Sequence, residues 1–288
     1  MIHVGQKAAV LWLFLPPALM LFSLFVALPM GEAAWYSLYN WNGYGRPEQF
    51  VGLANFERLF ENPAFKTALI NNGWIILMSL CIQMPLAMAT AVLLSERLRG
   101  TNTFRMIFFL PYVLAEIAAG LIWRFVYDGE YGLLAKMFSW FGQDAPYLLA
   151  DPDMAMVAIL VVIAWKYFGF HMVLYIAGLQ QIDRNLFEAA RIDGASGWQI
   201  FWRITLPLLK PTVKLSVFFG ILGSLQFFDM IMSMTKGGPF DSTQTMVSFL
   251  YNYGVTRMQI GFGSAVGVVV FVICVAFAFG YKRWLMKN

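Results

Sequence analysis

Residues 154–179 read MAMVAILVVIAWKYFGFHMVLYIAGL, and this stretch decides the fold class. Lys166 is its one charged residue, and its apolar side chains follow one another without the alternation of a half-buried strand. A helix of about 20 mostly apolar residues is long enough to cross the roughly 30 Å hydrocarbon core of a membrane. The stretch therefore predicts a membrane-spanning helix.

The rest of the chain has the same character. Of its 288 residues, 60% are hydrophobic and 12% are charged, and the charged share is about half that of a typical soluble domain. This composition excludes a soluble enzyme, a disordered chain and a secreted disulfide scaffold. The net charge of +4 is too small for a nucleic-acid-binding surface. We predict an all-α polytopic membrane protein, a single transmembrane domain over residues 1–288 with six transmembrane helices at residues 8–30, 69–94, 106–127, 154–179, 211–235 and 261–284.

Lys and Arg are distributed unevenly between the predicted loops. The N-terminus, residues 95–105, residues 180–210 and the C-terminus together carry eleven basic and four acidic residues. Residues 31–68, 128–153 and 236–260 carry six basic and ten acidic residues. Because cytoplasmic loops are enriched in Lys and Arg, we expect both termini to be cytoplasmic, in agreement with an even number of spans.

Residues 181–208, between the fourth and fifth predicted spans, read QIDRNLFEAARIDGASGWQIFWRITLPL. Asp183 can cap a first short helix, Gly194 can form the turn that follows it, and Ser196 can begin a capping box for a second helix. We expect Pro207 to end that second helix. Two short helices around a turn suit a docking element on the cytoplasmic surface, and an interfacial amphipathic connector is the alternative.

The same loop resembles the EAA loop of bacterial binding-protein-dependent ABC importers. Other stretches are similar to sugar-importer permeases, namely VGLANFERLF at residues 51–60 and FLPY at residues 109–112. The resemblance extends over nearly the whole chain and is closer to the first permease of the maltose, lactose and glycerol-phosphate pairs than to the second. The loop residues that match the EAA pattern are Glu188, Ala189, Ala190, Gly194, Ile204, Leu206 and Pro207.

The resemblance implies the type I ABC importer (MetI-like) permease fold in the bacterial cell inner membrane. It also implies three protein partners: a second permease subunit, an ATPase subunit dimer that binds ATP and Mg, and a periplasmic solute-binding protein that delivers a sugar or sugar derivative. The loop would contact the ATPase, with Glu188 as the polar contact, Ala189 and Ala190 allowing close approach and Gly194 making the turn.

Nucleotide and metal chemistry are not expected on this chain. No lysine follows a glycine, so the Gly-Lys-Ser/Thr of a P-loop is absent. Two cysteines in predicted spans and two histidines are too few for a metal or disulfide framework. We therefore expect a transport subunit that is not itself an enzyme, binds no cofactor or metal, and depends on a partner for ATP hydrolysis.

Charged residues within spans are candidates for function because each costs about 2.5–3.5 kcal/mol on insertion scales. The helical rise places Glu116 and Lys166 near mid-depth. They either form a salt bridge between two helices or face the substrate, in which case Lys166 would suit an acidic sugar. By position, the resemblance points to substrate contacts at Tyr112, Glu116, Gly169, Ser224 and Phe227. Neighbouring charged, aromatic and amide side chains extend the predicted pathway to Trp165, Lys166, Phe168, Gln226 and Asp229.

Two other classes of membrane protein compete with the importer. A secondary transporter could use Glu116, Lys166 and Asp229 as a proton or ion relay. Residues 194–197 read GASG, which matches the GxSG string of rhomboid-type intramembrane proteases. That chemistry needs a histidine base from a later helix, and no histidine follows His171. The secondary transporter therefore remains the main alternative.

Overall fold

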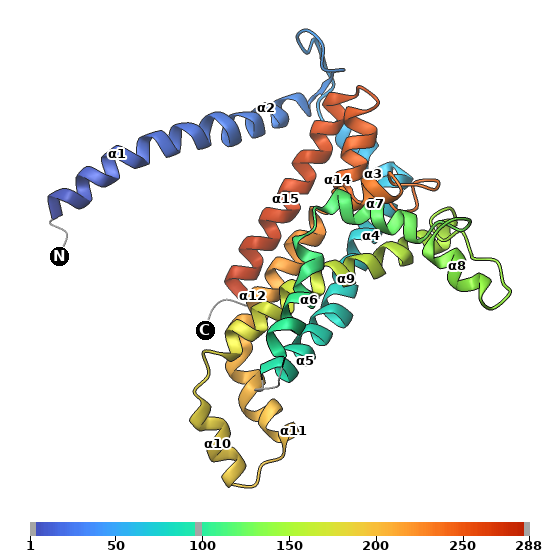
Figure 1. Ribbon diagram of the computed structural model, residues 1–288. Coiled ribbons are helices and arrows are strands. Elements are labelled where there is room, and N and C mark those ends of the chain that lie inside the picture. Colours follow the sequence, from blue (N-terminus) through green and yellow to red (C-terminus); the bar gives the residue numbers. More distant parts are fainter. Residues whose placement is uncertain (1–3, 96–99, 285–288) are drawn as a thin grey trace. The chain divides into compact units, whose positions relative to one another are not determined.

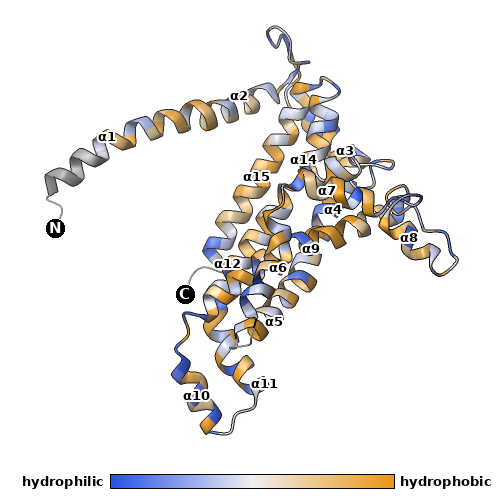
Figure 2. Cartoon of the chain, in the orientation of Figure 1, coloured by the Kyte–Doolittle hydropathy of each residue, from blue (hydrophilic) through white to orange (hydrophobic). Residues whose placement is uncertain are grey.

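The computed structural model describes residues 4–95 and 100–284, and nearly all of its elements are helices (Figure 1). The predicted all-α membrane fold is confirmed, with six spans if a bent helix pair counts as one. Figure 2 shows hydrophobic residues along these helices. Arg97, Arg99 and Lys287, three of the residues used to predict the orientation, lie outside the described residues. The five unbent candidate spans are Trp12–Tyr36, Pro63–Ser95, Pro152–Leu179, Gly197–Leu225 and Ile260–Arg283.

The chain divides into two compact units. Unit 1 comprises residues 1–62 and 250–271. Its short hairpin is fixed by Asn55, whose Nδ2 donates to the carbonyl oxygens of Ser37 at 2.8 Å and Tyr39 at 2.9 Å. The elements of unit 1 are α1 (Val4–Phe22), the π-helical turn η1 (Ser23–Ala27), α2 (Leu28–Tyr36), the antiparallel strands β1 (Tyr39–Asn40) and β2 (Gln49–Phe50), α3 (Ala54–Glu61), the π-helical turn η4 (Leu250–Val255) and the start of α15 (Ile260–Trp284).

Unit 2 comprises residues 63–249 and 272–288, and α9 is its central helix. Apolar side chains of α9 are buried against α4, α7 and α13 on one side and against α5 and α12 on the other. The elements of unit 2 are α4 (Pro63–Met78), η2 (Ser79–Gln83), α5 (Met84–Ser95), α6 (Thr101–Val113), α7 (Glu116–Val126), α8 (Leu133–Ser139), α9 (Pro152–Leu179), α10 (Arg184–Ile192), α11 (Gly197–Ile200), η3 (Phe201–Thr205), α12 (Leu206–Leu225), α13 (Asp229–Met234), α14 (Met246–Phe249) and the end of α15.

The third predicted span, residues 106–127, is not one straight helix. Leu114 and Ala115 have extended backbone conformations, and the axes of α6 and α7 differ in direction by 97° at this point. Pro111 lies in the last turn of α6, where it cannot donate a backbone hydrogen bond. The span is therefore broken, and Glu116 is the first residue of its second part.

The fifth span also differs from the prediction of residues 211–235. Its helix starts at Gly197, in the predicted loop, continues to Leu225 and is separated from α13 by three residues. The sequence predicted that Pro207 ends the preceding helix, and this prediction is wrong because the helix continues to Leu225. The N–H of Leu206, the residue before it, donates to the carbonyl of Phe201, five residues back. This wider π-helical turn gives the proline ring room that an α-helix lacks.

Two further prolines occupy the same position after a π-helical turn. Leu28, before Pro29, donates to the carbonyl of Ser23, and Met84, before Pro85, donates to that of Ser79. Both helices continue through their prolines. The first span is longer than predicted because it continues through Pro29 to Tyr36. The second is longer because it starts at Pro63, whereas the fourth and sixth agree with the prediction to within two residues at each end.

Candidate functional site

Lys166, in the middle of α9, is bound to the end of α6. Its Nζ donates to the carbonyl oxygens of Leu114 at 2.5 Å, Pro111 at 3.3 Å and Tyr112 at 3.4 Å. The last carbonyls of a helix have no partner within the helix and carry partial negative charge. With only 1% of its surface exposed, Lys166 is a buried cap for α6 at the break.

Glu116 is bound by a different residue of α9. The hydroxyl of Tyr167 donates to its Oε1. Among the described residues, no ion pair within 4.0 Å joins Glu116 to Lys166, so the salt bridge that the sequence left open does not form. The lysine and the carboxylate are each bound by other groups on opposite sides of the α6–α7 break.

A cavity of about 390 Å³ lies beside this break, within unit 2. It is in the size range of small-molecule sites, about 300–1,000 Å³. Tyr112 and Phe170 stack on its wall with ring centroids 5.0 Å apart. Six residues of the predicted substrate pathway line it: Tyr112, Glu116, Ser224, Gln226, Phe227 and Asp229.

The other four predicted pathway residues do not line this cavity. Lys166 caps α6, as described above. Trp165 packs edge-on against Trp123, and Phe168 packs edge-on against Phe108, with centroids 5.3 Å and 5.6 Å apart. A Cβ at Gly169 would overlap the backbone of Phe108 and Phe109, so this glycine permits the close approach of α6 and α9. In this structure these four residues have packing and capping contacts.

Several lining residues were not in the predicted set. The most informative is Gln83, at the end of η2, which is 2% exposed and whose Nε2 has no hydrogen-bond partner among the described residues. A glutamine within an apolar span is a pattern from which the sequence could have predicted a cavity residue. The other lining residues were harder to predict because they come from helices that are distant in sequence. The remaining lining residues are Ile75, Ser79, Ile163, Tyr167, Phe170, His171, Phe219, Gly220, Gly223 and Phe228.

His171, which lines the cavity, is held by a hydrogen bond to the neighbouring helix α12. His171 Nδ1 lies 2.7 Å from Ser216 Oγ of α12, and both side chains are buried. Asn72 links α4 to the same region, because its Nδ2 donates to the carbonyl of Ser224 at 2.5 Å and its Oδ1 accepts from the Met246 N–H at 2.9 Å. Hydrogen bonds among four helices, α4, α9, α12 and α14, therefore hold this region together.

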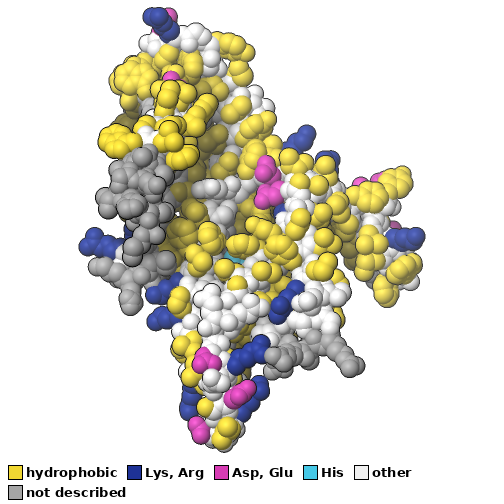
Figure 3. Space-filling model, turned by 60° about the vertical axis from the view of Figure 1, so that its left-hand side comes forward, with side chains coloured by type: hydrophobic (Ala, Val, Ile, Leu, Met, Phe, Trp, Pro, Cys, Tyr) yellow, Lys and Arg dark blue, Asp and Glu magenta, His cyan; other side chains and the backbone are white. Residues whose placement is uncertain are grey.

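The segment 181–208 folds locally as its sequence predicts. Asp183 accepts from the N–H of Asn185 at 3.0 Å and caps α10, and Gly194 has a φ of +80°. Ser196 and Gln199 form the reciprocal capping box at the start of α11, with bonds of 3.3 Å and 2.8 Å. Figure 3 shows charged side chains gathered at the lower end of the molecule, where α10 and α11 lie.

Large apolar side chains are exposed on this same segment. The exposed fraction is 86% for Ile192 and 71% for Trp198, while Glu188 and Ala189 are also exposed. Such side chains on a polar loop are typical of an interaction surface.

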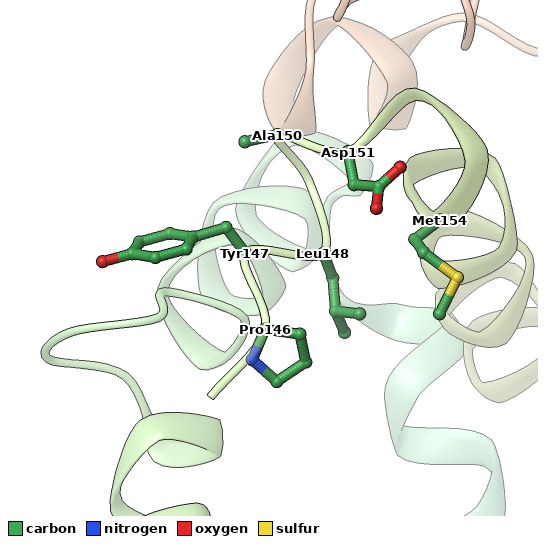
Figure 4. Close-up of a pocket in the computed structure, with 6 residues that line it drawn as sticks. All are labelled: Pro146, Tyr147, Leu148, Ala150, Asp151 and Met154. Atoms are coloured by element: carbon green, nitrogen blue, oxygen red, sulfur yellow. The ribbon is translucent and has the colours of Figure 1, made fainter. Parts of the chain in front are cut away.

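A second, shallower pocket of about 330 Å³ lies before α9 (Figure 4). Asp151 caps α9 by accepting from the Asp153 N–H at 2.8 Å, and the Tyr147 ring points away from this carboxylate. Tyr147 donates instead to Glu130 at 3.2 Å, and this carboxylate raises the pKa of the phenol. Because its one carboxylate already serves as a helix cap, we assign no function to this pocket.

Comparison with known proteins gives consistent matches. A model of the family described as "Binding-protein-dependent transport system inner membrane component" matches residues 83–287. The diacetylchitobiose uptake system permease protein NgcF of Streptomyces coelicolor is 32% identical over 278 residues, covering 92% of this chain and 79% of that protein. The lactose transport system permease protein LacF of Rhizobium radiobacter is 32% identical over 281 residues, covering 93% and 91%.

A solved structure matches the fold. It is a chain of a bacterial ABC transporter involved in the import of the acidic polysaccharide alginate, with a TM-score of 0.83 and 23% sequence identity, covering 97% of each chain. At this identity the likeness concerns the fold alone.

Proposed function

Because the chain belongs to the family of binding-protein-dependent transport system inner membrane components, we propose that it is the permease subunit of an ABC importer for a sugar or sugar derivative. The chain is a multi-pass protein of the inner membrane. Its relatives named for diacetylchitobiose and lactose support a carbohydrate substrate. On this proposal both termini and the α10–α11 segment are cytoplasmic, and the whole chain acts as one transmembrane domain.

One observation carries the proposal: an unbroken helix connects the α10–α11 segment to the cavity. It starts at Gly197, directly after the turn at Gly194, and runs to Leu225. Phe219, Gly220, Gly223 and Ser224, in its last two turns, line the cavity. A displacement of the turn would therefore be transmitted to the cavity wall along one continuous helix.

The partners follow from this arrangement. An ATPase subunit dimer would bind ATP and Mg and receive the α10–α11 segment, with Glu188 as the polar contact and Ile192 and Trp198 as apolar contacts. Ala189 and Ala190 would allow close approach, and Ile204, Leu206 and Pro207 would connect the segment to α12. A second permease subunit would complete the pathway, and a periplasmic binding protein would deliver the sugar.

The substrate pathway in this chain is the cavity of unit 2. Tyr112, Phe227 and other aromatic rings would contact the C–H faces of a sugar, and Glu116, Ser224, Gln226 and Asp229 would bind its hydroxyl groups. Gln83, which the sequence did not single out, also lines this cavity. Lys166 would act on this pathway indirectly, by fixing the α6–α7 break.

A first experiment compares the importer with the secondary transporter. The chain is expressed with the genes beside its own, purified through an affinity tag and reconstituted into liposomes. We expect an ATPase and a second permease to copurify, and sugar uptake to require ATP and binding protein. Uptake by this chain alone, driven by a proton gradient, would show a secondary transporter instead.

A second experiment tests the coupling role of Glu188. In Glu188→Lys we expect the complex to hydrolyse ATP without transporting sugar, or to lose the ATPase subunit on purification. Asp144→Lys is the matched control, since it makes the same change of charge at an exposed carboxylate in the α8–α9 connection. Normal ATP-dependent uptake by Glu188→Lys would refute the contact.

A further inference from the structure

The cavity also carries information about the charge of its substrate. We propose that it takes an uncharged saccharide and excludes anionic sugars such as sugar phosphates and uronates. This inference rests on the proposed function for its physiological meaning. The charge of the cavity itself can be measured whether or not the chain transports anything.

The charged groups that line the cavity are all of one sign. Its seventeen lining residues include two carboxylates, Glu116 and Asp229, and no lysine or arginine. In a site with low-dielectric walls, charges of one sign focus the field and repel ligands of the same sign. A sugar phosphate or uronate entering here would lose its hydration and meet two carboxylates, with no lysine or arginine among the lining residues.

Lys166 could in principle neutralise an anionic substrate, but its ammonium group does not reach the cavity. Its ammonium group makes three hydrogen bonds to the end of α6 and is not among the groups that line the cavity. To bind an anion it would have to abandon these carbonyls, and the carbonyl of Leu114 would lose its 2.5 Å hydrogen bond. Lys166, which the sequence suggested as a partner for an acidic sugar, therefore stabilises the end of α6 instead.

The neutral groups of the cavity fit a polyol. Gln83 lines the cavity, and its buried Nε2 has no hydrogen-bond partner among the described residues. The two carboxylates can accept hydrogen bonds from the hydroxyl groups of an uncharged sugar. In an anionic sugar, a phosphate or carboxylate group takes the place of one such hydroxyl and can only accept. Tyr112, Phe170 and Phe219 provide ring faces beside them.

Membership of the family does not decide this point. NgcF and LacF are named for diacetylchitobiose and lactose, whereas the structural neighbour belongs to a transporter of an acidic polysaccharide. Neutral and acidic substrates thus both occur among proteins similar to this chain. The residues of its own cavity are what favour the neutral class.

The charge is tested with a reporter cysteine in the cavity. Gly223 lines it, is exposed, and has open space where a Cβ would lie. Gly223→Cys is placed in a full-length chain with Cys81 and Cys274 changed to Ala. The purified chain in nanodiscs, with any subunits that copurify, is labelled with a cationic and an anionic methanethiosulfonate of similar size. Both rates are normalised to those of a free thiol.

We expect the cationic reagent to react about tenfold faster than the anionic one after normalisation. Gly197→Cys, an exposed position at the start of α11 with open space for a Cβ, is the control and should show no such preference. Adding Glu116→Gln to the cavity reporter should lower the ratio several-fold. A ratio equal to that of the control, or in favour of the anion, would overturn the inference.

Protection of Gly223→Cys by sugars then tests the ligand class. The panel consists of neutral and anionic pairs: lactose and lactobionate, trehalose and trehalose 6-phosphate, and glucose and glucose 6-phosphate. We expect neutral members to slow labelling more than their anionic partners. Greater protection by an anion, or no protection by any neutral sugar, would refute the proposal. A loss of ATP-dependent uptake alone would refute the proposed function but leave the charge ratio unaffected.

Discussion

Lys166 Nζ donates a 2.5 Å hydrogen bond to the carbonyl oxygen of Leu114, and this contact closes the break between α6 and α7. The two residues are 52 positions apart in the chain. The lysine thereby provides the hydrogen bonds that the end of α6 cannot make for itself. Its hydrogen bonds go to helix carbonyls, and Glu116 lies beyond ion-pair distance.

Lys166→Met is therefore expected to destabilise the protein. It removes the donor to the carbonyl of Leu114, at a cost of about 1–3 kcal/mol, whereas the carbonyl of Pro111 still accepts from the N–H of Leu114 at 3.3 Å. The free energy of unfolding is measured by SDS titration of the purified protein. Lys136→Met, an exposed change on α8, is the control. A variant as stable as the wild type that has lost sugar binding would instead make Lys166 a substrate group.

Gly169→Ala is expected to destabilise the packing of α6 on α9. The added methyl group would overlap the backbone of Phe108, which cannot move away as a flexible side chain could. Overpacking of this kind costs about 1–3 kcal/mol. The effect should appear as a lower melting temperature in detergent, followed by tryptophan fluorescence.

The matched control for this change is Gly73→Ala. Gly73 lies on α4, is exposed and has nothing within 4 Å of its Cβ position. Alanine there should be neutral or should stabilise the helix by up to about 1 kcal/mol. Equal melting temperatures for Gly169→Ala and Gly73→Ala would contradict the close approach of α6 and α9.

The sequence predicted α9 well and the third span poorly, for a common physical reason. The hydrophobic run of α9 is a local property, and its observed bounds begin two residues before the predicted ones and end at the same residue. The break after α6 depends on Lys166 of another helix, which no local pattern contains. Pro207 was misjudged because a π-helical turn, invisible in composition, makes room for it.

The candidate site divides in the same way. Caps within four residues of one another, such as Ser196 with Gln199, were identified from their spacing. Six of ten pathway residues line the cavity, since polar and aromatic residues in spans are a sound first guide. Gln83 and His171 were missed because the cavity forms between helices whose pairing the sequence does not reveal.

Asp128 provides a test of pH dependence outside the membrane spans. Its carboxylate accepts from the N–H groups of Tyr131 at 2.7 Å and Glu130 at 3.0 Å, and these bonds lower its pKa below the usual 3.8. A lowered pKa stabilises the turn above pH 3.8, and the stabilisation is lost as the pH falls through the folded-state value. Amide exchange of residues 130 and 131, corrected for intrinsic rates, should therefore accelerate at low pH.

Asp128→Asn is the control for this effect. Asparagine keeps an acceptor oxygen for the two N–H groups but does not titrate. Its amide exchange should be faster than that of the wild type at neutral pH and should show little further change as the pH falls. Wild-type exchange that is independent of pH between neutrality and pH 3 would show that the carboxylate does not hold this turn.

Gly194→Ala tests the turn that the proposed coupling depends on. Gly194 has a φ of +80°, a conformation that costs a residue with a Cβ about 1–2 kcal/mol. The strain can be relieved if the turn opens and α10 shifts relative to α11. We expect the purified complex to retain ATP hydrolysis but to transport less sugar per ATP. Gly197→Ala is the control, because Gly197 begins α11 without a positive φ and with open space at its Cβ position. If both variants transport as much sugar per ATP as the wild type, the geometry of this turn does not transmit the ATPase cycle.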